Sequence, residues 1–310
     1  MVSASLQRYV YVFAKPIPDS RLEITSSDYQ QFFSRDPEED MVIDGDLRIV
    51  KAVLDFFEIS RNLSIFVASE VPPGTGLGSS SSLTVALVKA ISTLLAKQYS
   101  KADIAKIACE IEIEKLGASI GKQDQYAASF GGINQISFSA QSIDVMPLQL
   151  ELKTQIGLAS NLSLYYTGRS HSSEDILYGQ ANRARSNEAD ISNRLKTLKN
   201  HAERAAELLL KSDLDGYGAL LHESWLIKRG ISDNITNDFI DECYERALDA
   251  GAIGGKITGA GSGGFLLVYA PKEAHSRVSA SLKEMGLHRM ACSFDHAGAL
   301  VLVNAGRLLV

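Results

Sequence analysis

Three glycines at alternate positions, followed by four serines, form the segment of this chain best suited to bind a phosphate group. The segment reads PPGTGLGSSSS over residues 72–82 and runs directly into an amphipathic sequence. Glycine lets backbone N–H groups turn toward one point, and the first turn of a helix adds the positive end of its dipole. We therefore predict a phosphate cradle formed by Pro73, Gly74, Thr75, Gly76, Leu77, Gly78, Ser79, Ser80 and Ser81.

Two common nucleotide loops do not fit this segment. A Walker A loop requires lysine after its last glycine, and this chain has Ser79 after Gly78. A dinucleotide-binding fingerprint that began at Gly74 would need glycine at position 79. A flexible glycine–serine linker also fits poorly, because two prolines precede the segment and a helical pattern follows it. The segment is therefore a phosphate loop of another kind.

Three alternate glutamates lie in a helical pattern that ends at Leu116. The apolar stripe of this helix consists of Ile104, Ile107, Ala108, Ile111 and Leu116. At about 100° per residue, Glu112 falls beside that stripe, whereas Glu110 and Glu114 fall on the opposite face. A carboxylate that faces the protein needs a partner, and a metal ion or a buried salt bridge would serve.

Hydrophobic periodicity predicts alternating strands and helices, which indicates an α+β protein. Strands are expected over residues 9–13, 63–69, 133–138, 143–148, 162–167 and 265–270, and again near the C-terminus. Helices are expected over 47–57, 79–97, 100–116, 122–130, 172–211, 213–228, 238–250 and 272–286. We predict an N-terminal domain over 1–152 and a C-terminal domain over 153–310, packed together without a linker.

Composition narrows the class of partner. The net charge is −6, which argues against a nucleic-acid surface, where a basic excess is expected. Cys109, Cys243 and Cys292 are isolated and show no zinc or disulfide spacing, which suggests a reducing cytoplasm. No apolar run approaches the roughly 18 residues of a membrane span. A small-molecule partner fits best, and the sequence predicts no oligomeric state.

Three segments together resemble the GHMP kinases, the family of galacto-, homoserine, mevalonate and phosphomevalonate kinases. They are the phosphate loop at 72–82, the stretch GKQDQYAASFGG at 121–132, and GGKITGAGSGGF at 254–265. The resemblance runs in the family's order along the whole chain. The stretch at 121–132 and LLHESWLIKR at 220–229 look most like the branch that phosphorylates D-glycero-D-manno-heptose 7-phosphate.

This resemblance implies a fold, a reaction and cofactors. The fold would be an N-terminal domain similar to ribosomal protein S5 and a ferredoxin-like C-terminal domain. The reaction would transfer phosphate from ATP to a hydroxyl group of a sugar or sugar phosphate with the help of Mg²⁺. Such a transfer requires the triphosphate charge to be neutralised and the acceptor hydroxyl to be placed in line.

The resemblance also implies roles for single residues. Ser80 and Glu112 would be the magnesium ligands, with an ordinary helix-capping serine as the alternative for Ser80. Asp124 would accept or orient the proton of the attacking hydroxyl, although an acid at this place is also favoured by the helix dipole. Lys122 would keep Asp124 ionised or contact a phosphate. Gly261, in the second glycine motif, would lie beside the nucleotide.

The chain departs from the family pattern at two places. Heptose kinases and galactokinases begin with a glycine-rich motif of the type GGGTD, which helps to bind the sugar, and Met1 aligns near the strand that follows it. Heptose kinases usually carry arginine where this chain has His171, with Arg169 as a possible substitute. Two alternatives therefore stay open: another sugar-1-kinase of the galactose or fucose type, and a non-catalytic binding protein on the same fold.

Overall fold

The computed structural model describes residues 1–36, 38–168, 189–232 and 234–305. These residues form two compact units. The first unit comprises residues 1–7, 74–77 and 133–294, and the second comprises 8–73, 78–132 and 295–310. The sequence boundary predicted near residue 152 falls inside the first unit, and the predicted phosphate loop contributes residues to both.

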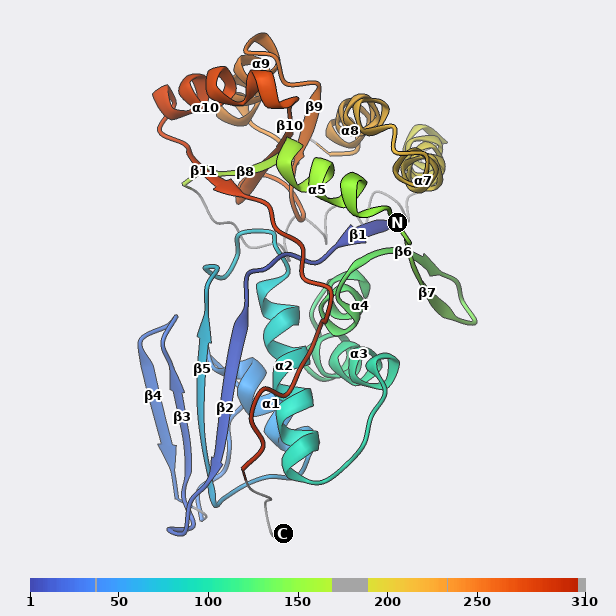
Figure 1. Ribbon diagram of the computed structural model, residues 1–310. Coiled ribbons are helices and arrows are strands. Elements are labelled where there is room, and N and C mark those ends of the chain that lie inside the picture. Colours follow the sequence, from blue (N-terminus) through green and yellow to red (C-terminus); the bar gives the residue numbers. More distant parts are fainter. Residues whose placement is uncertain (37, 169–188, 233, 306–310) are drawn as a thin grey trace. The chain divides into compact units, whose positions relative to one another are not determined.

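A mixed four-stranded sheet is the framework of the second unit (Figure 1). Its strands, in spatial order, are β2 (Val10–Pro16), β5 (Leu63–Ser69), β3 (Leu22–Ser26) and β4 (Gln31–Arg35). Strand β3 runs parallel to β5, and the other two pairs are antiparallel. Helices α1 (Arg48–Phe56) and α2 (Ser79–Leu94) lie on one face of this sheet.

The core of the second unit lies between this sheet and its helices. Alternate strand residues such as Leu22, Ile24 and Ile65 are almost completely buried, because successive side chains of a strand point to opposite faces. They pack with Leu87 and Ile91 of α2. The helix that carries the serines is thus fixed firmly to the sheet along its inner side.

Three short helices complete the second unit. They are α3 (Lys101–Cys109), the π-helix η1 (Glu110–Lys115) and α4 (Gln123–Phe130). Helix α3 begins with a capping box, in which the side chains of Ser100 and Asp103 are each bonded to the other residue's backbone N–H. The predicted helix end near Leu116 is confirmed, but its last turns are π-helical rather than α-helical.

An antiparallel four-stranded sheet organises most of the first unit. Its strands, in spatial order, are β11 (His288–Ala291), β8 (Leu162–Tyr166), β10 (Phe265–Tyr269) and β9 (Gly254–Ile257). The chain between them forms α7 (Ala189–Leu210), α8 (Leu214–Arg229), α9 (Asp238–Asp249), η2 (Lys272–Ala274) and α10 (His275–Glu284). The order along the chain is β8, the helices α7 to α9, β9 and β10, α10, and β11. This β-α-β-β-α-β order is that of a ferredoxin-like motif, as expected.

A smaller sheet in the first unit contains the start of the chain. It consists of β1 (Val2–Ala4), β6 (Ile133–Phe138) and β7 (Ile143–Pro147), all antiparallel. The α-amino group of Met1 donates a hydrogen bond of 2.7 Å to the carbonyl oxygen of Ile136. Helix α5 (Leu152–Asn161) then leads into β8.

Some elements of the structure have no clear signal in the sequence, and some that the sequence predicts are not formed. The sequence pattern did not predict β1, β3, β4 or α5, which are short or polar on one side. Of the strands expected after residue 286, β11 is formed, and beyond it the structure has no strand through residue 305. The predicted helical stretch 172–188, Arg169 and His171 lie outside the described residues.

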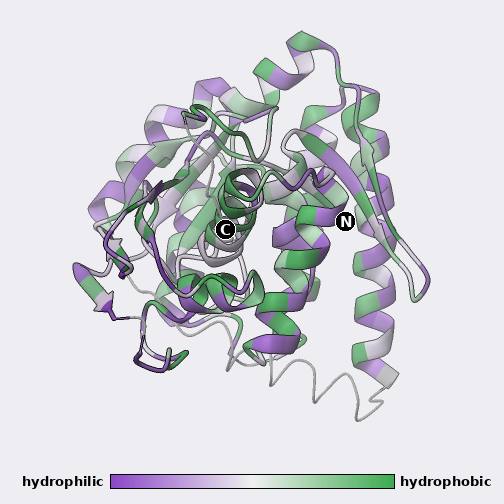
Figure 2. Ribbon diagram, turned by 90° about the horizontal axis from the view of Figure 1, so that it is seen from below, coloured by the Kyte–Doolittle hydropathy of each residue, from purple (hydrophilic) through white to green (hydrophobic). Residues whose placement is uncertain are grey.

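The helices of both units are amphipathic. Figure 2 shows hydrophobic and hydrophilic residues alternating around the helical ribbons, as expected for helices with one packed side. None of the helices described combines the length and apolar character that crossing a membrane would require.

Candidate active site

Asp124 lies against the last glycine of the phosphate loop. Gly78 precedes α2 with a φ of +71°, in the left-handed region that favours glycine. A Cβ atom at Gly78 would stand 3.2 Å from both Cβ and Cγ of Asp124. A larger residue would therefore strain the backbone and press on the carboxyl group. Gly78, the last glycine of the phosphate loop, and Asp124, the predicted catalytic base, are therefore adjacent within the second unit.

The orientation predicted for the three glutamates is confirmed. Glu112 is only 3% exposed, whereas Glu110 and Glu114 are exposed to solvent. Glu112 lies in the π-helix η1, and π-helical turns are frequent at functional sites because they redirect side chains. Of the three carboxylates, Glu112 alone faces the interior.

The carboxylate of Glu112 is held by polar groups from two neighbouring helices. Gln125 of α4 donates a hydrogen bond from Nε2 to Glu112 Oε2, and the side chains of Ser81 and Thr84 of α2 also hydrogen-bond to it. Burial raises the pKa of Glu112 above its usual value, while these three hydrogen bonds oppose the rise. No basic side chain in the described part of the chain forms an ion pair with Glu112. The buried salt bridge considered above is therefore not what holds this carboxylate.

The groups around Glu112 suit a hard cation. Carboxylate and neutral oxygen atoms are the ligands that Mg²⁺ prefers, and Gln125 Oε1 is buried without a hydrogen-bond partner among the described residues. Those residues contain no cluster of three acidic, histidine or cysteine side chains. Magnesium in kinases needs only one or two carboxylates, since phosphates and water supply the other ligands. The residues present thus fit a magnesium ion.

Ser80 is exposed at the start of α2. The Thr84 hydroxyl, which has a single proton, lies 3.1 Å from the Ser80 carbonyl oxygen as well as beside Glu112, and this contact involves the Ser80 backbone but not its hydroxyl. The hydroxyl that reaches Glu112 belongs to the next residue, Ser81. Ser80 as a magnesium ligand stays a prediction. Lys122 is also exposed, immediately before α4, and its role stays a prediction too.

Pro73, Ser79 and Ser80 border a small pocket in the second unit. Tyr29, Ile49, Val71 and Leu83 supply most of its apolar wall. The pocket thus places an apolar and aromatic surface beside the serines of the loop.

In the first unit, the two glycine motifs pack backbone against backbone. A Cβ at Gly76 would stand 2.8 Å from the carbonyl oxygen of Thr258, and one at Gly259 would stand 2.6 Å from Cα of Gly76. A Cβ at Gly264 would overlap the carbonyl group of Thr75. Glycine is therefore required on both sides of this contact, and the second motif fixes the path of Thr75 and Gly76.

Gly261 serves the turn of the second motif. It has a φ of +123°, and a Cβ there would stand 2.6 Å from the carbonyl oxygen of Ile235. The nearest atoms to that position thus belong to the segment before α9, and a role of Gly261 toward the nucleotide stays a prediction.

Lys228 of α8 braces the second glycine motif. Its Nζ donates a hydrogen bond of 2.7 Å to the carbonyl oxygen of Gly259, and burial lowers the pKa of Lys228 to about 7. His222, one and a half turns earlier, is bonded through Nδ1 to the hydroxyl of Tyr244 at 2.8 Å. Both side chains are therefore engaged within the first unit.

The steric role of Gly264 gives a testable difference between two glycines. We expect Gly264→Ala to lower the melting temperature clearly more than Gly286→Ala. Both positions have positive φ values, +83° and +81°, and each alanine pays about 1–3 kcal/mol of backbone strain. Only at Gly264 does the new methyl group also meet backbone atoms, because the space around Gly286 is open. Equal melting temperatures of the two variants by calorimetry would show that the two glycine motifs can move apart at Gly264 without loss of stability.

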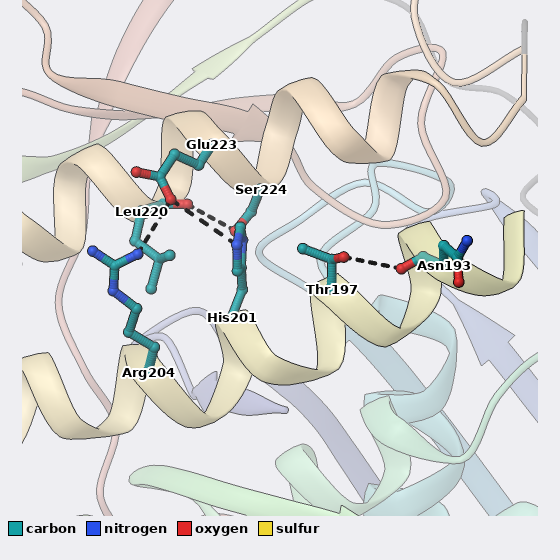
Figure 3. A network of polar contacts seen from close by, with 7 residues as sticks. All are labelled: Asn193, Thr197, His201, Arg204, Leu220, Glu223 and Ser224. Atoms are coloured by element: carbon teal, nitrogen blue, oxygen red, sulfur yellow. Dashed lines mark hydrogen bonds and ion pairs between the residues drawn. The ribbon is translucent and has the colours of Figure 1, made fainter. Parts of the chain in front are cut away.

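A cluster of histidine, serine and glutamate between α7 and α8 has the residue types of a hydrolase triad (Figure 3). His201 Nδ1 lies 2.9 Å from Ser224 Oγ, but that hydroxyl donates its proton to the carbonyl oxygen of Leu220 at 2.7 Å. Glu223 Oε2 lies 4.0 Å from His201 Nε2 and pairs with Arg204 at 3.4 Å. Because the serine proton is directed away from His201, the cluster joins two helices and does not form a nucleophile.

The sequence analysis missed two residues at the candidate site, Gln125 and Thr84. Both are fully buried polar side chains. Ser81 and Thr84 lie three residues apart on the inner side of a helix whose other buried residues are apolar except for Ser92, and this spacing could have indicated an inward polar patch. Gln125 lies inside the motif that was quoted, next to Asp124.

Two family models match separate parts of the chain. The model of the N-terminal domain of GHMP kinases matches residues 47–132, and that of their C-terminal domain matches residues 205–287.

Similar proteins cover most of the chain. The D-glycero-alpha-D-manno-heptose 7-phosphate kinase of Campylobacter jejuni is 32% identical over 92% of this chain and 86% of its own length. The mevalonate kinase of Saccharolobus solfataricus is 29% identical over 74% of this chain and 68% of its own.

Solved structures agree in fold. The crystal structure of a D-glycero-D-manno-heptose 1-phosphate kinase from Bacteroides thetaiotaomicron has a TM-score of 0.78 at 26% identity and covers 96% of this chain and 88% of its own. Lactococcus lactis galactokinase, with a TM-score of 0.77 at 16% identity over 96% of this chain and 88% of its own, shows a likeness of fold alone.

Proposed function

Because this chain belongs to the GHMP kinases, a family of ATP-dependent phosphotransferases, we propose that it phosphorylates a sugar phosphate. The proposed acceptor is the anomeric hydroxyl of D-glycero-D-manno-heptose 7-phosphate. The observation that carries the kinase reaction is the contact between Asp124 and Gly78, beside the buried carboxylate of Glu112. The choice of acceptor is supported by the heptose 7-phosphate kinase that is 32% identical over 92% of the chain.

The start of α2 would bind phosphate. Backbone N–H groups of the first helical turn after Gly78 have no partner within the helix, and the helix dipole is positive at this end. The turn therefore attracts the negative charge of a triphosphate. The Asp124 side chain packs on Gly78, and this packing fixes the distance between Asp124 and the first turn of α2.

Asp124 would orient the acceptor hydroxyl and take its proton as the new bond to phosphorus forms. Correct placement of this carboxylate against the hydroxyl contributes much of its effect. Ser80 and Glu112 would hold the magnesium ion, which neutralises charge on the phosphate oxygens when bound. Lys122, at the same helix start, would support Asp124 or a phosphate by its positive charge.

The apolar wall beside the loop would contact the base of the nucleotide. Tyr29 offers an aromatic face and Ile49 and Val71 an apolar wall, next to Pro73 and Ser79 of the loop. Nucleotide sites combine such apolar walls with a few placed polar groups. This arrangement supports ATP as the phosphate donor.

The substrate is tested by product analysis. Purified protein with ATP and Mg²⁺ should convert D-glycero-D-manno-heptose 7-phosphate to a bisphosphate with a new anomeric ³¹P signal. Galactose and fucose under the same conditions should give no more than a small fraction of this rate. Phosphorylation of galactose or fucose but not of the heptose phosphate would reject the proposed acceptor. ATP that is bound but not consumed with any of these sugars would favour a non-catalytic binding protein.

A further inference from the structure

Gln125 is fully buried in α4 and uses only half of its amide group. Nε2 donates to Glu112, whereas Oε1 has no hydrogen-bond partner among the described residues. A buried polar atom left without a partner destabilises the folded protein. Such atoms in folded proteins call for an explanation, for example a water molecule or an ion that binds there.

The amide cannot remove this cost by turning over. If its oxygen and nitrogen exchanged places, Oε1 would face the carboxylate of Glu112, and two acceptor oxygens would repel each other. The hydrogen bond to Glu112 therefore fixes which end of the amide carries the unpartnered oxygen. The nitrogen serves the carboxylate, and the oxygen is available to a donor from outside the chain.

The surroundings of Gln125 identify that donor by its chemistry. Ser81 and Thr84 hold Glu112 from α2, so the carboxylate is clamped between two helices of the second unit. The preceding residue, Asp124, packs on Gly78 at the end of the phosphate loop. A hard cation with its bound water fits this group of oxygen atoms, since Mg²⁺ usually keeps several waters when it binds to proteins.

We propose that Gln125 is a positioning residue for the cation of the kinase site. Its amide nitrogen holds the Glu112 carboxylate in one orientation, and its amide oxygen accepts a hydrogen bond from a water molecule bound to the cation. This inference rests on the proposed function and extends it to a residue that does not itself touch the cation. Groups that orient a metal ligand in this way typically affect metal affinity 10–100-fold.

The test measures cation binding without turnover. Free Mn²⁺ is followed by electron paramagnetic resonance during titration of the full chain with Mn²⁺ and a non-hydrolysable ATP analogue. Gln125→Leu should weaken Mn²⁺ binding by about 10–100-fold. Gln123→Leu is the matched control, because Gln123 is exposed on the same helix, and its affinity should stay within about twofold of wild type.

A double-mutant cycle separates positioning from a general loss of structure. In a Glu112→Gln background, adding Gln125→Leu should change Mn²⁺ affinity little, since the carboxylate that Gln125 positions is gone. Metal-free binding of the nucleotide analogue should be the same in wild type and Gln125→Leu. If Gln125→Leu does not fold, Gln125→Asn, whose amide is too short to keep both contacts, should show a smaller loss of Mn²⁺ affinity in the same direction.

Wild-type affinity for Mn²⁺ in Gln125→Leu, or an equal loss in both backgrounds, would overturn the inference. Failure of wild type to bind Mn²⁺ with the nucleotide would overturn both the inference and the cation site of the proposed function. If wild type binds Mn²⁺ and the cycle shows the expected coupling while heptose 7-phosphate is not phosphorylated, only the proposed acceptor is rejected.

Discussion

Asp124→Asn should lower kcat for phosphoryl transfer by about 10²–10⁴-fold, the range typical for loss of a general base. Asparagine has nearly the same shape as aspartate, so it can pack on Gly78 without a new clash. The amide no longer accepts a proton at neutral pH, which removes the chemical role but leaves the contact. KM for ATP should change little, because the phosphate loop and its helix are intact. Steady-state kinetics at saturating ATP and Mg²⁺ measure both quantities.

The matched control is an acid-to-amide change on a neighbouring element. Glu114→Gln removes an exposed carboxylate of η1, and its kcat should stay within about twofold of wild type. Melting temperatures of both variants should agree with wild type within about 2 °C. A kcat for Asp124→Asn close to that of Glu114→Gln would remove Asp124 from the reaction and leave only its packing role.

Helical periodicity was sufficient to predict which glutamate faces inward. It placed Glu112 beside the apolar stripe and Glu110 and Glu114 outside it, and the structure agrees although the last turns are π-helical. The prediction held because the stripe begins in the regular part of the helix and Glu112 lies only one turn beyond it. The local helical periodicity thus predicts which way the Glu112 side chain points, whereas the groups that hydrogen-bond to its carboxylate depend on the tertiary fold.

Contacts between distant segments were beyond the reach of the sequence pattern. Glycines were recognised at both motifs, but nothing in their spacing shows that Gly264 meets Thr75 or that Gly78 meets Asp124. Gln125 was overlooked for the same reason, since its hydrogen bond to Glu112 joins two helices. Strands β3 and β4 were missed because each is only five residues long. Strand β3 does alternate, with Leu22 and Ile24 buried, whereas β4 breaks the period-two pattern with two consecutive phenylalanines.

The chain passes from one unit to the other several times, and the physical reason for this cannot be seen in the sequence composition. The chain enters the first unit at its start, leaves it, and returns for residues 74–77. Those four residues are drawn into the first unit by close backbone packing on Thr258 and Gly259. A change in composition marks a linker between domains, but a backbone contact of this kind leaves no such mark.

Glu112→Gln should raise the stability of the metal-free protein while it abolishes most of the activity. Burial raises the pKa of Glu112, so its charged form at neutral pH is less stable in the folded than in the unfolded chain. A neutral glutamine avoids this cost. We expect the melting temperature to rise by about 2–4 °C, which corresponds to roughly 1 kcal/mol for a unit of this size.

The sign of the pH dependence follows from the raised pKa. As pH falls from neutral toward the ordinary carboxyl range, Glu112 takes up its proton earlier in the folded than in the unfolded chain, and wild type gains stability. The advantage of Glu112→Gln should therefore be largest near pH 7–8 and shrink as the solution becomes acidic. Calorimetry of both proteins across this range, without metal, measures the difference.

Activity should change in the opposite direction, because the cation neutralises charge that develops on the phosphate. Loss of its carboxylate ligand is expected to lower kcat by at least about 100-fold at ordinary Mg²⁺, since a bound metal contributes several kcal/mol to the transition state. Addition of Mg²⁺ and nucleotide should raise the melting temperature of wild type much more than that of Glu112→Gln. A variant that is less stable than wild type without metal would mean that the buried charge already has a compensating partner. If Glu112→Gln is more stable than wild type and still fully active, the cation does not bind at residue 112. The expected combination, a stabler protein that has lost its catalysis, is the pattern of a buried charge kept for function at the expense of stability.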